Sequence, residues 1–304
     1  MDSLRPQSRH ILFHSIIVLL LTVAADTSRA QGPPIFTDTP IMLGLEGRGV
    51  RTFLQVERRD GLLQDGEQIP DSLDRSVTTY LYPLIVPVNL RTTTQVGAVV
   101  PFLTRRVEST AGTMTETGLG DVTVFLKQLL VQVDRRAETF RVAVKGSAKL
   151  PTGSEDANVP LGSGSVDYGL SAVGGWVKQR WGIYGEAIYF VNTSKGDTDF
   201  GNRFGYNAAL GFRLIPSVYE RYPSPQLNLF LELNGNVVGK TQVNEQANPN
   251  SGGSRLFVSP GLQYVGGRRW LVEAAVQLPV VDEPNGTQLA TDWTARVGTR
   301  VLIF

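Results

Sequence analysis

The sequence contains no cysteine, and its two histidines, His10 and His14, both lie within the first fifteen residues. Without cysteine the chain has no disulfides, no iron–sulfur clusters, no thiolate nucleophile and no cysteine-ligated zinc. A chain that begins after residue 30 would also lack histidine, which excludes Ser-His-Asp and Cys-His catalysis and the common catalytic zinc sites. We therefore predict that the protein is not an enzyme and has no catalytic residues, no cofactor and no metal ion.

The sequence also lacks a charge surplus. It has 29 Lys and Arg against 28 Asp and Glu, a formal net charge of +1. Nucleic-acid-binding domains usually carry a basic excess or stripe, so we expect no nucleic-acid partner. After residue 30 no apolar run approaches the ~18 residues that indicate a transmembrane helix.

The first thirty residues have the features of a cleavable signal peptide. Arg5 and Arg9 precede an apolar stretch over residues 11–25, and Ser28-Arg29-Ala30 places small residues before Gln31. Removal of residues 1–30 leaves 26 basic and 26 acidic residues. We predict a signal peptide over 1–30, an N-terminal segment over 31–48 and one further domain over 49–304. The pattern leaves open whether the segment over 31–48 is a periplasmic tail or a small plug.

Most of the remaining chain alternates between apolar and polar side chains with period two, which is typical of strands with two different faces. In residues 226–236, leucines at 227, 229, 231 and 233 oppose Asn228, Phe230, Glu232 and Asn234. Residues 138–150 follow the same pattern, with Arg141, Lys145 and Lys149 on the polar face. The apolar faces are unbroken, whereas the polar faces carry charges in the middle of the strands.

Twelve such segments are separated by alternately long and short connections. The predicted strands cover residues 49–59, 75–86, 91–102, 119–131, 138–150, 165–177, 181–193, 203–215, 226–237, 254–265, 269–281 and 291–303. Short turns are expected at Pro87–Leu90, 132–137, 178–180, 216–225 and 266–268. Long loops are expected at 60–74, 103–118, 151–164, 194–202, 238–253 and 282–290.

Apolar faces alone fit either a soluble sandwich or a membrane barrel, which place them on opposite sides. The strand lengths, the export signal and the long–short alternation favour the barrel. We predict an all-β, transmembrane, antiparallel up-and-down barrel of about 12 strands, within a range of 10–14, in the cell outer membrane. Its expected partners are outer-membrane lipid and lipopolysaccharide, the barrel-assembly machinery during biogenesis and a small-molecule solute.

The end of the chain departs from the usual pattern of such barrels, which finish in an aromatic residue with apolar residues two apart before it. Phe304 and Leu302 fit that phase, whereas Arg300 and Gly298 do not, and Ile303, Val301 and Val297 fit the opposite phase. A β-bulge near the end would reconcile the two phases.

Charged residues on the polar faces are expected to line the lumen. They are Arg51, Glu57, Arg141, Lys145, Lys149, Asp167, Glu186, Arg213, Glu232, Glu273, Arg296 and Arg300. Such residues can line a solute path and set its selectivity. Alternatively, they pair with one another and close the lumen, because barrels of intermediate width can be open, plugged or filled by side chains. The sequence leaves these two alternatives open.

Two motifs resemble a known family. Residues 117–121 read TGLGD and are followed by VTVFLK, and residues 149–153 read KLPTG, followed by LGSGSVDYGL at 161–170. Together with Thr37-Asp38-Thr39-Pro40, they resemble the outer-membrane family named for the MetA pathway of phenol degradation. Ser163 stands where that family usually has threonine. The resemblance implies a Gram-negative outer-membrane barrel with a role in uptake of aromatic or other hydrophobic compounds, and it transfers no site residues.

The sequence thus predicts an outer-membrane channel or transporter for passive uptake of small solutes, with hydrophobic or aromatic compounds as the implied class. The alternative is a non-conducting barrel that serves a structural or surface-interaction role.

Overall fold

The computed structural model describes residues 32–44, 47–155, 157–219 and 223–303. The predicted signal peptide lies outside the described residues. Twelve long strands form the wall, and antiparallel pairing of the last strand with the first closes it. These strands are β1 (Arg48–Gln64), β3 (Ser76–Arg91), β4 (Thr94–Ser109), β6 (Thr123–Arg135), β7 (Glu138–Lys149), β8 (Asp167–Lys178), β9 (Trp181–Val191), β12 (Arg203–Ile215), β13 (Gln226–Val238), β16 (Gly253–Val265), β17 (Trp270–Pro284) and β18 (Thr287–Ile303).

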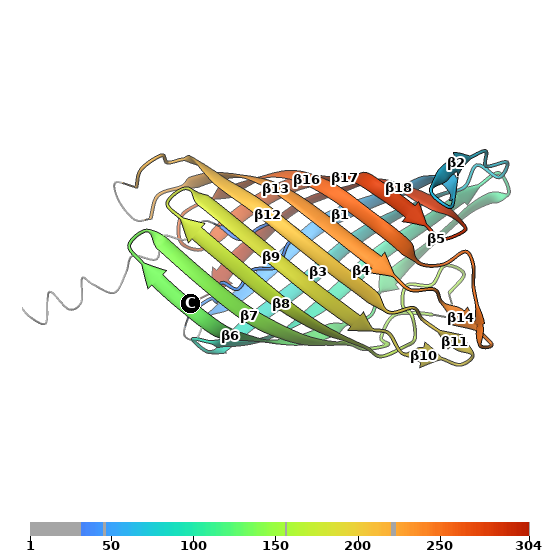
Figure 1. The fold of residues 1–304 in the computed structure, drawn as a ribbon, viewed down its shortest axis with the longest axis horizontal. Coiled ribbons are helices and arrows are strands. Elements are labelled where there is room, and N and C mark those ends of the chain that lie inside the picture. The colour runs from blue at the N-terminus through green and yellow to red at the C-terminus, as the bar shows by residue number, and fades with distance from the viewer. Residues whose placement is uncertain (1–31, 45–46, 156, 220–222, 304) are drawn as a thin grey trace, which may run out of the picture.

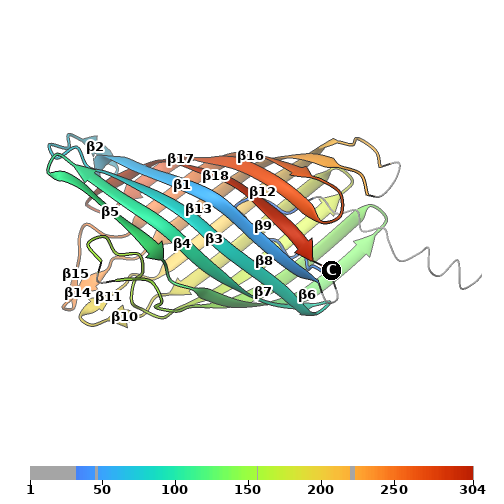
Figure 2. The same cartoon turned by 180° about the vertical axis from the view of Figure 1, so that it is seen from behind.

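Each wall strand pairs with its neighbours in chain order, so the barrel has up-and-down topology. Figures 1 and 2 show tilted strands that wrap around one axis, as closure of a sheet requires. The predicted fold class, including the count of about twelve strands, is confirmed. Among the described residues, no helix is long and apolar enough to cross a membrane.

The two ends of the barrel differ. At one end, which we call the turn end, neighbouring strands are joined by short connections such as Thr92–Thr93, Arg136–Ala137 and Gln179–Arg180. At the other, the loop end, most connections are longer and several contain additional short strands (Figure 1). The long loop predicted at 282–290 is wrong, because only Asn285–Gly286 joins β17 to β18. The additional short strands lie in the other loop-end connections. They are β2 (Glu67–Ile69), β5 (Gly112–Leu119), β10 (Ser194–Lys195), β11 (Thr198–Asp199), β14 (Gln242–Val243) and β15 (Gln246–Ala247). The last four form a small sheet of their own.

The period-two pattern of the sequence matches the two faces of the wall. On β13, Leu229, Leu231 and Leu233 are exposed, whereas Phe230 and Glu232 between them are fully buried. The same alternation leaves large apolar side chains on the outer surface of most wall strands. An apolar exterior around a polar interior is the arrangement of an outer-membrane barrel.

Several predicted strands are too short, because the structure continues them into the expected turns and loops. The expected turn at Pro87–Leu90 is part of β3, and the turn lies at Thr92–Thr93. Pro87 pairs with Gly97 within the ladder, so this proline does not end the strand. The expected loop at 103–118 is largely the hairpin of β4 and β5, which extends the wall at the loop end. There the strands carry polar residues on both faces, so alternation gives no signal.

The last strand needs no bulge near its end. β1 and β18 pair continuously from Arg48↔Ile303 to Arg58↔Trp293, and the first register shift lies beyond that, at Arg58. Val297, Val301 and Ile303 are exposed on the outer face, so the second of the two phases is the one adopted. Phe304 lies outside the described residues.

Candidate functional site

A stretch of chain before β1 occupies the lumen. Residues 32–44, which we call the lumen segment, lie among inward-facing side chains of the wall. Ile35 is fully buried in a cluster with Tyr184, Phe230 and Ala275, and Met42 is buried against Leu129 and Ala143. An eight-stranded barrel is filled by its own side chains, whereas a wider one leaves space. In this twelve-stranded barrel the lumen segment takes up part of that space.

Glu232 anchors the lumen segment through its backbone. Its carboxylate accepts hydrogen bonds from the backbone N–H of Ile35 at 2.7 Å, of Phe36 at 3.1 Å and of Thr37 at 2.7 Å. Successive N–H groups that converge in this way form an anion-binding concavity. Glu232 is fully buried in the middle of β13, so these three donors replace the water that a carboxylate would otherwise require.

Arginines hold the carbonyl groups of the same stretch. Arg51 donates to the carbonyl oxygen of Ile35 at 2.5 Å and Arg300 to that of Pro34 at 2.5 Å. Both guanidinium groups also bind the carboxylate of Glu273, at 2.8 and 2.9 Å. Gln263 adds a hydrogen bond to the carbonyl oxygen of Pro33 at 2.8 Å. The wall therefore recognises the backbone of the lumen segment from both its donor and its acceptor side.

Asp38 provides the charged contact of the lumen segment. Its two carboxylate oxygens lie 2.6 Å from Lys127 Nζ and 2.5 Å from Lys145 Nζ. The backbone N–H of Asp38 donates to Glu186, which also lies 3.7 Å from Lys145. Two lysines and two carboxylates therefore form a charge-balanced group on the β6, β7 and β9 side of the lumen.

Arg296 differs from the other inward arginines of this region. Its guanidinium lies close to two aromatic rings, 4.0 Å from the centroid of Phe36 and 4.2 Å from that of Phe53. It donates twice to Gln55 and once to the carbonyl oxygen of Ile35. Within the part of the chain that the structure describes, no carboxylate forms an ion pair with it.

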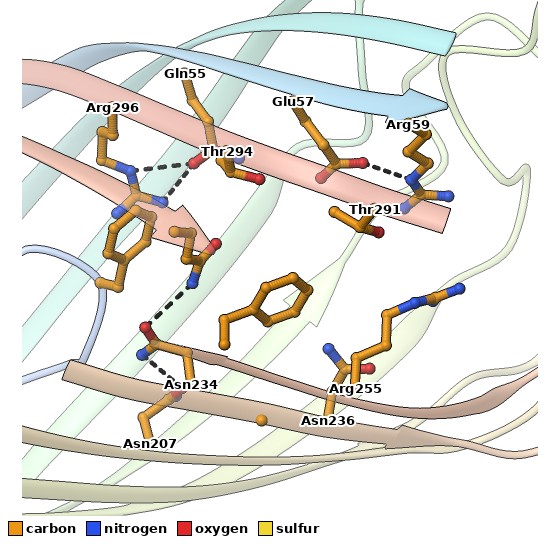
Figure 3. A pocket seen from close by; sticks show the side chains of 14 residues that line it. Gln55, Glu57, Arg59, Asn207, Asn234, Asn236, Arg255, Thr291, Thr294 and Arg296 are labelled. Atoms are coloured by element: carbon orange, nitrogen blue, oxygen red, sulfur yellow. Dashed lines mark hydrogen bonds and ion pairs between the residues drawn. The ribbon is translucent and has the colours of Figure 1, made fainter. Parts of the chain in front are cut away.

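Above the lumen segment, toward the loop end, lies a cavity of about 290 Å³ that we call the vestibule. Side chains of β1 and β18 face those of β12, β13 and β16 across it (Figure 3). Its lining is mostly polar, with two aromatic rings. The lining residues are Phe36, Gln55, Glu57, Arg59, Asn207, Asn234, Gly235, Asn236, Arg255, Phe257, Gln277, Thr291, Thr294 and Arg296.

Polar groups of the vestibule wall are linked by hydrogen bonds. Asn234 accepts from Ser259 at 2.8 Å and from Gln277 at 3.1 Å, and it donates to Asn207 at 3.0 Å. Asn207 in turn donates to Glu186 at 2.9 Å. This chain connects the vestibule to the charged group around Asp38, and it fixes the amide side chains in one orientation.

The two sequence motifs meet at the loop end. Asp121 accepts hydrogen bonds from the backbone N–H of Gly153 at 3.0 Å and of Ser163 at 2.9 Å. Lys149 lies 3.2 Å from Asp121 and also forms an ion pair with Asp167. Burial alone would raise the pKa of Asp121, but the N–H donors of Ser163 and Gly153 and the ammonium of Lys149 outweigh it and lower the pKa. Both motifs thus hold the 150–166 connection against the start of β6.

The structure separates the twelve predicted lumen residues into four groups. Arg51, Lys145, Glu186, Glu232, Glu273, Arg296 and Arg300 surround the lumen segment, and Glu57 lies in the vestibule with Arg59. Lys149 and Asp167 belong to the motif contacts. Arg141 and Arg213 lie toward the turn end, where Arg141 pairs with Asp134 and Arg213 stacks on Tyr219. Their role in solute selectivity stays a prediction.

Sequence reasoning missed Asp38, Lys127, Gln55, Phe36 and the asparagines of the vestibule. Lys127 lies on the inward face of β6 between Phe125 and Leu129. Because both neighbours on this face are apolar, the sequence did not identify the face as polar. The register of β6 also shifts between Leu129 and Val131, so the pattern changes phase within the strand. The available signal for the vestibule was the inward phase of Asn207 on β12 and of Asn234 and Asn236 on β13.

A closed barrel with an apolar exterior, charged interior and partly filled lumen defines the class of outer-membrane β-barrels. The comparisons with known proteins agree. The model of the family described as "Putative MetA-pathway of phenol degradation" matches residues 75–295. The chain belongs to this family. Among curated proteins, no match is found.

Solved structures share the fold at low sequence identity. An outer membrane channel from Pseudomonas putida F1 is 12% identical, with a TM-score of 0.71, and the match covers 89% of this chain and 100% of the channel. The β domain of the Bordetella autotransporter BrkA is 10% identical, with a TM-score of 0.49 over 84% of this chain and 98% of that one. The translocator domain of NalP from Neisseria meningitidis is 12% identical, with a TM-score of 0.43 over 96% of each chain. The similarity to the Pseudomonas putida F1 channel shows that the two proteins share a fold.

Proposed function

We propose that this protein is an outer-membrane channel that admits small solutes carrying an aromatic ring and a polar group. The observation that carries the proposal is the vestibule, a cavity of about 290 Å³ at the loop end in which Phe36 and Phe257 lie among amide and hydroxyl groups. Its volume is near the lower limit of typical ligand pockets and suits a single ring. The family description and the fold shared with an outer membrane channel support the same function.

Passage through the barrel requires a path past the lumen segment, because this segment forms the floor of the vestibule. Short turns of such barrels face the periplasm and long loops face outside. A solute would therefore enter the vestibule from outside and reach the periplasm when the lumen segment shifts.

One observation favours a second candidate, a non-conducting barrel. Backbone donors and acceptors of residues 33–39 are bound by wall side chains at 2.5–3.3 Å, as expected for a permanently filled lumen. The two candidates differ in one outcome, because a non-conducting barrel predicts no uptake phenotype in any variant.

The test uses a deletion strain of the host, complemented with the full chain, and measures depletion of a single-ring aromatic substrate at limiting concentration. Phe257→Trp narrows the vestibule and should slow depletion several-fold, whereas Phe204→Trp on the outer face of β12 is the matched control and should not. At saturating substrate all strains should be alike. A deletion strain that depletes limiting substrate as fast as wild type would refute the channel.

A further inference from the structure

Charges around the lumen segment do not cancel, and the excess lies at Arg296. Near Ile35 the wall presents Arg51, Arg296 and Arg300 against Glu232 and Glu273, three cations against two carboxylates. Glu273 is shared by Arg51 and Arg300, and Glu232 is satisfied by backbone N–H groups. The group of Asp38, Glu186, Lys127 and Lys145 is balanced by itself. One positive charge therefore remains without a carboxylate.

Arg296 also has N–H groups and partial exposure with which it can bind an anion. A guanidinium has five N–H donors, and the three hydrogen bonds to Gln55 and Ile35 leave two without a partner among the described residues. The side chain is partly exposed and forms part of the vestibule lining. Phe36 and Phe53 pack close to the guanidinium, with ring centroids 4.0 and 4.2 Å from its Cζ. Guanidinium N–H groups without a partner are the donors that bind a carboxylate.

We propose that Arg296 is a specificity-determining residue of the vestibule and binds the carboxylate of a single-ring aromatic acid. This inference rests on the proposed function and narrows its solute class. The ring of such an acid would lie toward Phe257, within the cavity of about 290 Å³. Arg59 and Arg255 also line the vestibule, but each is paired with an acid, Glu57 and Asp282, at 2.7 and 2.8 Å. They are therefore less suited to hold the ligand.

Binding at Arg296 would also act on the lumen segment. The carboxylate competes with the carbonyl oxygen of Ile35 for the same guanidinium, 2.7 Å away. A ligand that draws Arg296 toward the vestibule removes one of the contacts that hold the segment. Solute recognition and opening of the floor would then share one residue.

Isothermal titration calorimetry on the full chain purified from outer membranes tests the inference with benzoate and with benzyl alcohol, which has the same ring without the charge. We expect benzoate to bind at least tenfold more tightly, because a site built for a charged group rejects the analogue that lacks it. Arg296→Gln should abolish the preference, and Arg296→Lys should restore part of it. Equal affinity for the two ligands would overturn the inference.

Because Arg296 also contacts the lumen segment, a second pair of variants leaves Arg296 unchanged. Thr294 lies two residues away on the same face of β18 and lines the vestibule. Thr294→Glu supplies a competing carboxylate and should reduce benzoate affinity at least tenfold, whereas Thr294→Gln, of equal size, should reduce it much less. Equal losses in both variants would contradict a charge-specific site. Failure of both ligands to bind, together with normal substrate depletion in the deletion strain, would instead refute the proposed function.

Discussion

Replacing Asp38 with Asn should release the lumen segment. The substitution leaves Lys127, whose side chain is 6% exposed, without its carboxylate. Removing one partner from a buried ion pair costs about 3–5 kcal/mol. Because 23% of the Asp38 side chain is still exposed, we take the lower end, about 3 kcal/mol. At ~1.4 kcal/mol per factor of ten, the population with an undocked segment should rise about 100-fold.

The absence of cysteine gives a clean assay for this change. Thr37 is 3% exposed and its hydroxyl has no hydrogen-bond partner within the described chain, so Thr37→Cys is a mild substitution that places one thiol in the docked segment. A maleimide reaches this thiol only when the segment opens, so the labelling rate follows the opening equilibrium. We expect labelling about 100-fold faster when Asp38→Asn is added.

Asp199→Asn in the same cysteine background is the matched control, because Asp199 is exposed on β11. It should leave the labelling rate at the starting value. A rate that Asp38→Asn does not change would refute the view that the ion pairs of Asp38 hold the segment in the lumen.

Three further predictions concern the lumen and the motif contacts. Deletion of residues 32–44 should increase single-channel conductance in a planar bilayer and favour anions, since the remaining wall around the segment has more cations than carboxylates; unchanged conductance would contradict this. Gly153→Ala should destabilise the 150–166 connection by about 1–3 kcal/mol, because a Cβ there would lie 2.9 Å from backbone. Hydrogen exchange would detect the loss, and Gly146→Ala, with open space, should show none. The pKa of Asp121 is lowered, so its contribution to stability is complete above the ordinary pKa of about 4 and is lost only as pH falls through the lower folded value. Protease resistance of the connection should therefore persist at pH ~4 and vanish below it, whereas resistance lost near pH 5 would disprove this assignment.

The strands β12 and β13 could be predicted from the sequence because the alternation of apolar and polar residues determines them. Residues 203–215 were predicted as a strand and β12 has the same bounds; the prediction of 226–237 differs from β13 by one residue. These strands separate lipid from lumen along their whole length, so alternation is unbroken. The hairpin of β4 and β5 has no such contrast, because Arg105 and Arg106 place charge on consecutive positions and therefore on both faces.

The contacts of the lumen segment had no comparable signal. Glu232 binds the backbone N–H of Ile35 across 197 positions of the chain, and backbone groups carry no sequence signature. Arg51 and Arg300 likewise bind carbonyl oxygens, which every residue has. The sequence therefore predicts which side chains face inward, but a contact between a side chain and a distant backbone becomes visible only in three dimensions.

We expect the two alternatives for the inward charges to correspond to two states of the barrel, with the lumen segment docked or withdrawn. With the lumen segment docked, most of them are satisfied by one another or by its backbone, as in a closed lumen. With the segment withdrawn, Asp38 and the backbone acceptors leave together, and the mid-lumen wall retains Arg51, Lys127, Lys145, Arg296 and Arg300 against Glu186, Glu232 and Glu273. A wall with this excess of cations would attract anions into the lumen, because the low-dielectric surroundings focus its electric field. The same side chains that bind the segment would therefore select the solute that replaces it, which is why an anionic group on the solute and opening of the lumen are expected to go together.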